Sequence, residues 1–264
     1  MHSRYRSVAA HGPGPEPVRP GDHATQVDRD LECALIELLE AHFGMVGVVA
    51  EERISDGAGI LNPDADLRAY IDPIDGTHLY NRGIPGSTST VGFEISGRLC
   101  SGIVYSPDTG VLRIVRRGDP AMTVALAAPY VAPEQTSDAN RTVAVKSGLR
   151  RSMPSLERAL VDHGYRIENL GSVANRLEAV AGGRIAGLVK SVQATHGVTR
   201  LWGVAAGLLL CEDAGVPMFW HESNQILAVG DPGIADSLAA DGVCHPTAGD
   251  LDSLWHTMKA RGRA

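Results

Sequence analysis

The residues best suited to chemistry lie in the segment DPIDGT at 72–77, which directly follows the apolar run 67–71. A second acidic pair, Glu51-Glu52, directly follows the apolar run 45–50. Carboxylates delivered by successive strand ends repel one another unless a cation lies between them. Hard oxygen ligands of this kind suit Mg²⁺ better than zinc. The pattern therefore predicts a Mg²⁺ site.

The same segment offers groups that suit a phosphoryl group. A proline restricts the turn, so the carboxylates of Asp72 and Asp75 and the carbonyl of Ile74 can point to one place. Gly76 and Thr77 follow with backbone N–H groups that suit a phosphate. Metal ligands on one side and amides on the other predict a phosphate-ester site.

A purely structural interpretation of these residues is also open. Asp-Pro and Asp-Gly are common turn dipeptides, Glu-Glu is usually a solvated surface pair, and Thr77 alone could be a helix cap. The co-occurrence of these acidic groups after successive strands favours the functional interpretation.

The elements that must position these residues follow from hydrophobic periodicity. Apolar residues at 31, 34, 35, 38 and 39 predict a helix, with Thr25 as its N-cap. The runs 45–50 and 67–71 predict strands. A hairpin is expected over 90–95 and 99–105, followed by a third strand at 111–116. This half of the chain is expected to contain an antiparallel meander.

The second half mixes elements. A strand is expected at 142–145 and helices near 155–163, 173–182 and 204–214, with Gly215 as a C-cap glycine. Asp231-Pro232 predicts the start of another helix, and a closing helix is expected over 251–258. Residues 1–21 are interpreted as a flexible Gly/Pro-rich leader, and 22–264 as one α/β (α+β) domain. Within it, we expect a metal-binding subdomain over 22–140 and a substrate-side subdomain over 141–264.

Composition limits the classes of function. The 264 residues are 44% hydrophobic and carry a net charge of −7, which is typical of a globular protein. No apolar run is long enough to span a membrane, and the acidic balance disfavours nucleic-acid binding. The four cysteines form no CxxC pair, which favours a reducing compartment and a cytoplasmic location. The expected partner is small.

Several segments resemble the inositol monophosphatase family of magnesium-dependent, lithium-sensitive phosphatases. They are AEE at 50–52, DPIDGT at 72–77, LWGVAAGLLLCEDAGV at 201–216, DHATQVDRDLE at 22–32 and GSVANRLEAVAGGR at 171–184. The resemblance implies a layered α/β/α/β/α sandwich of the sugar phosphatase type, and a homodimer.

The resemblance also implies roles for individual residues. The implied Mg²⁺ ligands are Glu51, Asp72, the Ile74 carbonyl and Asp75. The implied catalytic residues are Glu51, Thr77 and Asp75, of which Thr77 and Glu51 would position and activate the attacking water. The implied phosphate-binding residues are Gly76 and Thr77, through their amides. Gly171 and Ser172 would face the alcohol portion of the substrate, and Asp28 would lie behind the metal ligands.

The sequence departs from the family pattern after Trp202. The family has an aspartate there that ligates a second metal, whereas this chain has Gly203. Losing that ligand predicts a weaker second Mg²⁺ site, and the freed space would suit a bulkier sugar. His196 is a candidate for a substrate contact. In addition, the Gly/Pro-rich leader stands where the family has an N-terminal helix.

The predicted function is a Mg²⁺-dependent phosphomonoesterase that hydrolyses a small sugar phosphate or an inositol-like cyclitol phosphate through metal-activated water. No GxSxG or HExxH motif points to another mechanism. Two alternatives stay open. One is a phosphatase for 3'-phosphoadenosine-type nucleotides or sugar bisphosphates, although only 5% aromatic residues mildly favour a sugar over a base. The other is a noncatalytic, ligand-binding paralogue, suggested by Gly203.

Overall fold

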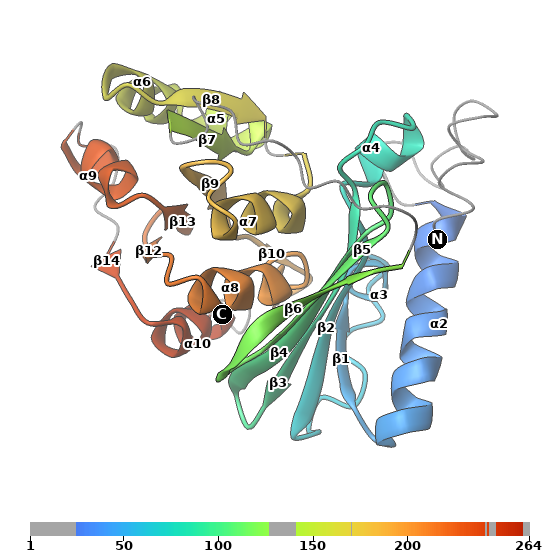
Figure 1. Ribbon diagram of the computed structural model, residues 1–264. Helices are drawn as coiled ribbons and strands as arrows, with labels where there is room; N and C mark the ends of the chain where they lie inside the picture. The colour runs from blue at the N-terminus through green and yellow to red at the C-terminus, as the bar shows by residue number, and fades with distance from the viewer. Residues whose placement is uncertain (1–24, 127–140, 170, 241, 243–246, 261–264) are drawn as a thin grey trace.

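The computed structural model describes residues 25–126, 141–169, 171–240, 242 and 247–260. Two six-stranded sheets are separated by a layer of helices, and each sheet has further helices on its outer face (Figure 1). This order confirms the predicted α/β/α/β/α sandwich. The predicted leader over 1–21 lies outside the described residues.

The first sheet has the order β1-β2-β3-β4-β5-β6. Its strands are β1 (Gly47–Ala50), β2 (Leu67–Asp75), β3 (Thr88–Ile95), β4 (Arg98–Ser106), β5 (Val111–Arg116) and β6 (Asp119–Ala125). Strands β1 and β2 are parallel, and the remaining neighbours are antiparallel. The predicted hairpin turns at Ser96 and Gly97, both with positive φ, as a tight two-residue turn requires. The meander is confirmed, while β6 was not predicted.

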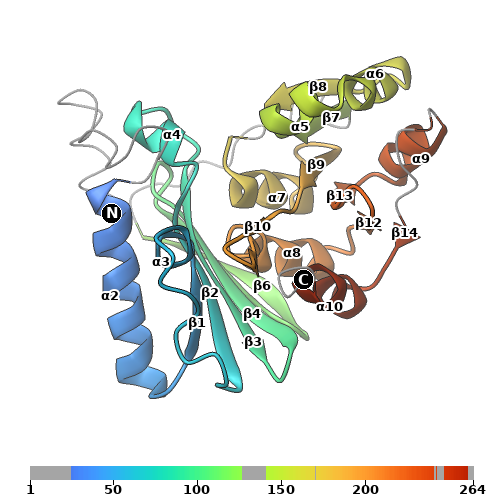
Figure 2. The same ribbon diagram turned by 180° about the vertical axis from the view of Figure 1, so that it is seen from behind.

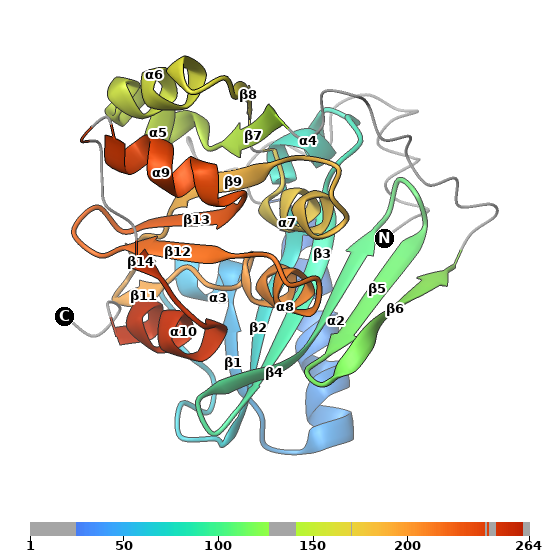
Figure 3. The same ribbon diagram turned by 60° about the vertical axis from the view of Figure 1, so that its left-hand side comes forward.

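The second sheet has the order β14-β12-β13-β9-β7-β8. Its strands are β7 (Thr142–Val145), β8 (Arg166–Asn169), β9 (Gly187–Ser191), β12 (Met218–His221), β13 (Ile226–Gly230) and β14 (Thr247–Ala248). Of these, only β7 was predicted. A separate short hairpin, β10 (Ala194–Thr195) with β11 (Val198–Thr199), follows β9. Figure 3 shows this sheet beside the helices that separate it from the first one.

Helices supply the other three layers. They are α2 (Gln26–Phe43), α3 (Glu51–Ser55), α4 (Thr77–Asn81), α5 (Ser147–Ser152), α6 (Pro154–Asp162), α7 (Val173–Ala181), α8 (Ala205–Asp213), α9 (Pro232–Ala240) and α10 (Leu251–Ala260). The prediction for α2 is confirmed in detail, because Thr25 caps it and forms a reciprocal capping box with Asp28. Helix α2 covers the outer face of the first sheet (Figure 2). No helix in the described part is long and apolar enough to cross a bilayer.

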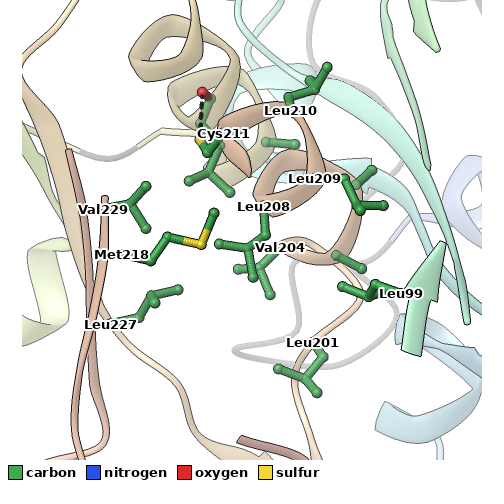
Figure 4. Close-up of a cluster of buried hydrophobic side chains, with 14 of the residues drawn as sticks. Leu99, Leu201, Val204, Leu208, Leu209, Leu210, Cys211, Met218, Leu227 and Val229 are labelled. Atoms are coloured by element: carbon green, nitrogen blue, oxygen red, sulfur yellow. Dashed lines mark hydrogen bonds between the residues drawn. The ribbon is translucent and has the colours of Figure 1, made fainter. Parts of the chain in front are cut away.

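The main core surrounds α8, which is apolar on all sides because it lies between the two sheets. Its leucines pack against Leu99 of β4 and against Leu227 and Val229 of β13 (Figure 4). The helix approaches the first sheet closely: a Cβ added at Gly102 would lie 2.8 Å from the Cα of Ala206. This close contact fixes the start of α8, and the segment that precedes it, against the first sheet.

Candidate active site

The parallel pairing of β1 and β2 brings the acidic segments together. Ala50 is paired with Ile71, so the residues that follow them, Glu51 and Asp72, emerge at the same end of the sheet. In the pairing of β2 with β3, the register shifts between Asp72 and Asp75. The three carboxylates line one pocket, and we call this set, Glu51, Asp72 and Asp75, the acidic wall.

A carboxylate from α2 holds the backbone that carries Glu51. The N–H groups of Glu52 and Arg53 each donate a hydrogen bond of 2.8 Å to the Glu32 side chain. These amides belong to the first turn of α3, where backbone donors lack partners within the helix. Glu32 therefore fixes the start of α3, and its contribution was not predicted from sequence.

The acidic wall is crowded with negative charge. Asp72 is buried, and burial followed by the charges of Glu51 and Asp75 raises its pKa well above the usual range. Burial also raises the pKa of Asp75 to about 6. Buried carboxylates that line one pocket repel one another unless a proton or a cation lies between them.

The donor set fits a hard divalent cation in its chemistry. The pocket is lined by three carboxylates and by Ile74, whose carbonyl is a predicted metal ligand. Oδ1 of Asp72 is buried and has no hydrogen-bond partner within the described residues. In the same part of the chain, no three His, Cys, Asp or Glu side chains already form a metal-binding cluster. Asp75 Oδ2 and Glu51 Oε1 each have other partners, as described below.

Gly76 and Thr77 lie at the start of α4, beside the acidic wall. Gly76 has φ +86°, and an added Cβ would lie 3.1 Å from the Cβ of Ser172, so both the backbone conformation and the space require glycine. The Thr77 hydroxyl donates to the Ile74 carbonyl at 2.9 Å and lies 3.4 Å from Asp28 Oδ1. Burial raises the pKa of Asp28 to about 6, and the Glu51 charge adds to this effect.

The three predicted substrate contacts lie in different surroundings. Ser172 is buried, and its hydroxyl donates to Asp75 Oδ2 at 2.8 Å; the N–H of Ala174 donates to the same oxygen at 2.7 Å. Ser172 therefore contacts a carboxylate rather than the pocket. Gly171 packs near Leu79 and does not line the pocket either. His196 is exposed at the turn between β10 and β11, away from the pocket lining. Roles in substrate binding stay predictions for all three.

Three basic residues of the pocket were missed by sequence reasoning. Lys146 follows β7, Lys190 lies in β9, and Arg200 follows β11; all three line the pocket that contains the acidic wall. We call Lys146, Lys190 and Arg200 the basic wall. A signal was present in the composition, because lysine occurs only at 146, 190 and 259 in an arginine-rich chain.

The basic wall is itself electrostatically strained. Lys190 is buried, and burial followed by the charge of Lys146 lowers its pKa to about 8, while Asp75 opposes this shift. Partial desolvation and the Arg200 charge lower the pKa of Lys146. Arg200 pairs with Glu51 Oε1 at 3.2 Å, and its guanidinium lies 5.6 Å from the ring centre of Trp202. The Glu51–Arg200 pair thus joins the two walls.

Gly203 faces the acidic wall directly. A Cβ added there would lie 2.9 Å from Oδ2 of Asp72 and 3.8 Å from Oδ1 of Asp75. Because the added atom would press on a buried carboxylate, any side chain at this position requires Asp72 to move. The absence of the side chain therefore lets Asp72 occupy this space.

Comparison with known proteins identifies the family. The model of the inositol monophosphatase family matches residues 10–249. The chain belongs to this family. An inositol-1-monophosphatase of Mesorhizobium japonicum is 30% identical over 210 residues, covering 74% of this chain and 71% of that protein. The Nus factor SuhB of Pasteurella multocida is 26% identical over 197 residues, covering 74% and 70%.

Solved structures agree with this assignment. An inositol monophosphatase from Anabaena superposes with a TM-score of 0.63 at 25% identity, covering 84% of this chain and 88% of that one. The matched stretch covers 66% to 71% of the length of the first curated relatives. Membership in the inositol monophosphatase family supports the assignment of this chain as a phosphatase. The substrates that appear in the names of the relatives are properties of those proteins.

Proposed function

We propose that this inositol monophosphatase family member is a Mg²⁺-dependent phosphomonoesterase that acts on a small sugar phosphate or cyclitol phosphate. The observation that carries the proposal is that Glu51, Asp72 and Asp75 line one pocket, where a buried oxygen of Asp72 has no hydrogen-bond partner within the described residues. Such a cluster of carboxylates favours a divalent cation, since neutralising several carboxylates by protonation is costly at neutral pH.

In this proposal Glu51, Asp72, Asp75 and the Ile74 carbonyl hold Mg²⁺. When bound, Mg²⁺ supplies a lowered pKa for a water molecule and neutralises charge on the phosphoryl oxygens. Ser172 and the Ala174 amide keep Asp75 oriented, because both donate to one of its oxygens and leave Oδ1 on the pocket side.

Thr77 is proposed to position the attacking water together with Glu51. Its hydroxyl donates to Ile74 O and has Asp28 Oδ1 within 3.4 Å. Asp28 also accepts hydrogen bonds from the Thr25 N–H and hydroxyl through Oδ2, so its orientation is fixed. The Thr77 hydroxyl can therefore donate its hydrogen bond to Asp28, which leaves its oxygen lone pairs to accept a hydrogen bond from the water. The amides of Gly76 and Thr77 would bind the phosphoryl group.

Two other functions keep specific support. Gly203 supports a noncatalytic, ligand-binding paralogue, because it replaces a family metal ligand. The name Nus factor SuhB, carried by a relative, also points to roles besides hydrolysis in this family. The second alternative is a phosphatase for 3'-phosphoadenosine-type nucleotides or sugar bisphosphates, which the basic wall supports. We favour hydrolysis because Glu51, Asp72, Asp75 and Thr77 are all retained.

We further propose that the protein works in the cytoplasm, as the cysteine pattern favours, and as a homodimer, as the resemblance implies. Size-exclusion chromatography with light scattering tests the dimer directly. A single species at the mass of one 27.9 kDa chain would refute it.

The deciding experiment measures phosphate release from a panel of sugar, cyclitol and nucleotide monophosphates, with Mg²⁺ and with EDTA. We expect turnover with Mg²⁺ only, and loss of turnover in Asp75→Asn. The matched control is Asp162→Asn, which removes an exposed carboxylate on α6. Binding without turnover across the whole panel would support the noncatalytic alternative instead.

A further inference from the structure

Two of the six carboxylate oxygens of the acidic wall already have partners. Oδ2 of Asp75 accepts hydrogen bonds from the hydroxyl and the amide at the start of α7. Oε1 of Glu51 accepts one from the Arg200 guanidinium at 3.2 Å. Mg²⁺ takes six oxygen ligands in near-octahedral geometry and usually keeps several waters, so the remaining oxygens can bind one ion. Two ions about 3.5–4 Å apart would have to share them.

The backbone beside the acidic wall adds no further ligand. Gly203 lies there, and a Cβ added to it would be 2.9 Å from Oδ2 of Asp72 and 3.8 Å from Oδ1 of Asp75. A side chain at this position would thus reach both aspartates, but glycine contributes no side-chain oxygen. A second ion would depend on water for most of its ligands, which lowers its affinity.

Arg200 brings a permanent positive charge to the acidic wall. Its guanidinium donates to Glu51 and lies 5.6 Å from the ring centre of Trp202, so both a carboxylate and an aromatic ring hold it in place. An arginine keeps its charge at any physiological pH. Arg200 therefore occupies the Glu51 oxygen that a second ion could otherwise use.

Lys190 adds another positive charge to the same pocket. The residue lies in β9 with 6% of its surface exposed, and it lines the pocket together with Asp72 and Asp75. Burial and the charge of Lys146 lower its pKa to about 8, whereas the charges of Asp75 and Asp72 oppose this shift. The ammonium is thus tethered in the field of the two aspartates, where it would repel a second divalent ion.

Formal charge leads to the same number of ions. The acidic wall carries three negative charges and the basic wall three positive ones. A phosphate monoester brings about two negative charges, which one Mg²⁺ balances. A second divalent ion would leave two surplus positive charges in a partly buried pocket, which is costly. The first ion is still favoured, because Oδ1 of Asp72 is buried and has no hydrogen-bond partner in the described part of the chain.

We propose that this site binds a single divalent cation, and that Arg200 and Lys190 supply the positive charge that a second ion would otherwise bring to the phosphoryl group. The inference rests on the proposed function and narrows it, since it sets the number of ions. Both side chains are hydrogen-bond donors suited to phosphoryl oxygens, and charge-assisted hydrogen bonds of this kind are strong. Catalysis then needs one Mg²⁺ per chain.

The test counts the Mn²⁺ ions that bind to the full-length wild-type protein, with Mn²⁺ in place of Mg²⁺ because it is paramagnetic. Equilibrium dialysis gives the number of ions. Electron paramagnetic resonance tells a single ion from a pair, because two ions about 3.5–4 Å apart are magnetically coupled. We expect one ion per chain and an uncoupled spectrum. Two coupled ions would overturn the inference and leave the proposed function standing, whereas no bound ion would overturn both.

Arg200→Met is the main variant, because it keeps an unbranched side chain and removes its charge. We expect Mn²⁺ to bind about 3- to 10-fold more tightly, since a positive charge beside Glu51 is lost. At the same time kcat for phosphate release should fall about 10- to 100-fold. Lys190→Met should shift both quantities in the same directions, and it replaces Arg200→Met should that variant not fold, as judged by circular dichroism. A merely structural role would weaken Mn²⁺ binding as well as kcat, and that result would overturn the inference.

A second set of variants separates the effect of Arg200 from that of the absent carboxylate. Gly203→Asp alone adds a carboxylate but keeps Arg200, so we expect it to bind one ion. Gly203→Asp combined with Arg200→Met also frees the Glu51 oxygen, and it should bind a coupled pair. Two ions in Gly203→Asp alone would overturn the role of Arg200, because the absent carboxylate would then set the number of ions.

The control is Arg158→Met, which removes one positive charge from an exposed position on α6. It should change neither the number of Mn²⁺ ions nor their affinity. A wild-type protein that binds one ion and releases no phosphate from any substrate would refute the proposed function, but it would support the single-ion site.

Discussion

The acidic wall and the basic wall face the same pocket but are built in different ways. The acidic wall comes from the ends of two neighbouring parallel strands, and two of its members lie in one six-residue motif. The basic wall consists of three single residues, at 146, 190 and 200, from separate parts of the second half of the chain. In the proposed function the local motif would carry the chemistry, whereas the dispersed residues complete the lining of the same pocket.

The most severe test of the acidic wall is Asp72→Asn. We expect activity to fall about 100- to 1,000-fold, as for the loss of a group that stabilises charge in the transition state. The metal-free protein should become more stable, because the change removes a buried charge that Glu51 and Asp75 repel. Phosphate release and urea denaturation in EDTA measure the two effects. Equal activity of the variant and the wild type would show that Asp72 of the acidic wall is not needed for catalysis.

The pH dependence of stability gives a second test, because Glu52, the residue after Glu51, is also buried among negative charges. Burial, with the charges of Glu51, Asp28 and Glu32, raises the pKa of Glu52 to about 8. A pKa raised above its unfolded value of 4.5 means that folding favours the protonated form. Stability from this group is therefore full below pH 4.5 and is lost as the pH rises through 8.

Glu52→Gln removes that loss. In EDTA we expect the variant to exceed the wild type by roughly 2 kcal/mol at pH 9, with little difference at pH 5. Urea denaturation at pH 5, 7 and 9 measures the difference, and Glu168→Gln, at an exposed position of β8, is the control. A variant that is less stable than wild type at pH 9 would contradict the prediction.

A matched pair at Gly203 tests how the acidic wall tolerates a side chain. Gly203→Ala places a Cβ 2.9 Å from Asp72 Oδ2, and we expect it to weaken Mg²⁺ binding by up to about tenfold. Gly203→Asp adds the same Cβ together with a carboxylate, so it should bind Mg²⁺ more tightly than the alanine variant. Calorimetric titration with Mg²⁺ gives both affinities. Tighter binding with unchanged substrate preference would reject a pocket reshaped for bulkier sugars.

The smallest effects are expected for substitutions of Ser172 and His196, which have different surroundings in the structure. Ser172→Ala should lower the free energy of unfolding by about 1 kcal/mol, because α7 loses its N-cap and Asp75 loses a donor. His196→Asn should leave kcat/KM within about twofold, since the side chain is exposed and asparagine tolerates the φ of +47°. A large rise in KM for His196→Asn would restore it as a substrate contact.

Much of the fold could be predicted from patterns that act over short distances. Thr25 with Asp28 predicts the start of α2, and the turn at Ser96 and Gly97 predicts the β3–β4 hairpin. Strands β8, β12 and β13 were missed, because short strands in the second sheet carry little periodicity and depend on neighbours far away in sequence.

The candidate site likewise contains some residues that could be predicted from the sequence and others that could not. The strand–carboxylate pattern predicted that Glu51, Asp72 and Asp75 lie together, and the parallel pairing of β1 with β2 brings them to one pocket. Lys190 could not be assigned to the site, since a lysine in a strand is normally solvated and only the packing of the second sheet against α7 turns it inward. The role of Glu32 could not be predicted either, because it depends on where α3 begins.

Ser172 and the Ala174 amide have a consequence for how this protein can be divided or recombined. Both belong to the second half of the chain, yet they hold an aspartate of the first half. A chimera that took its first sheet from one relative and its second sheet from another would inherit Asp75 without the donors shaped for it. The two halves must therefore be exchanged together, however separate their sheets look in the ribbon.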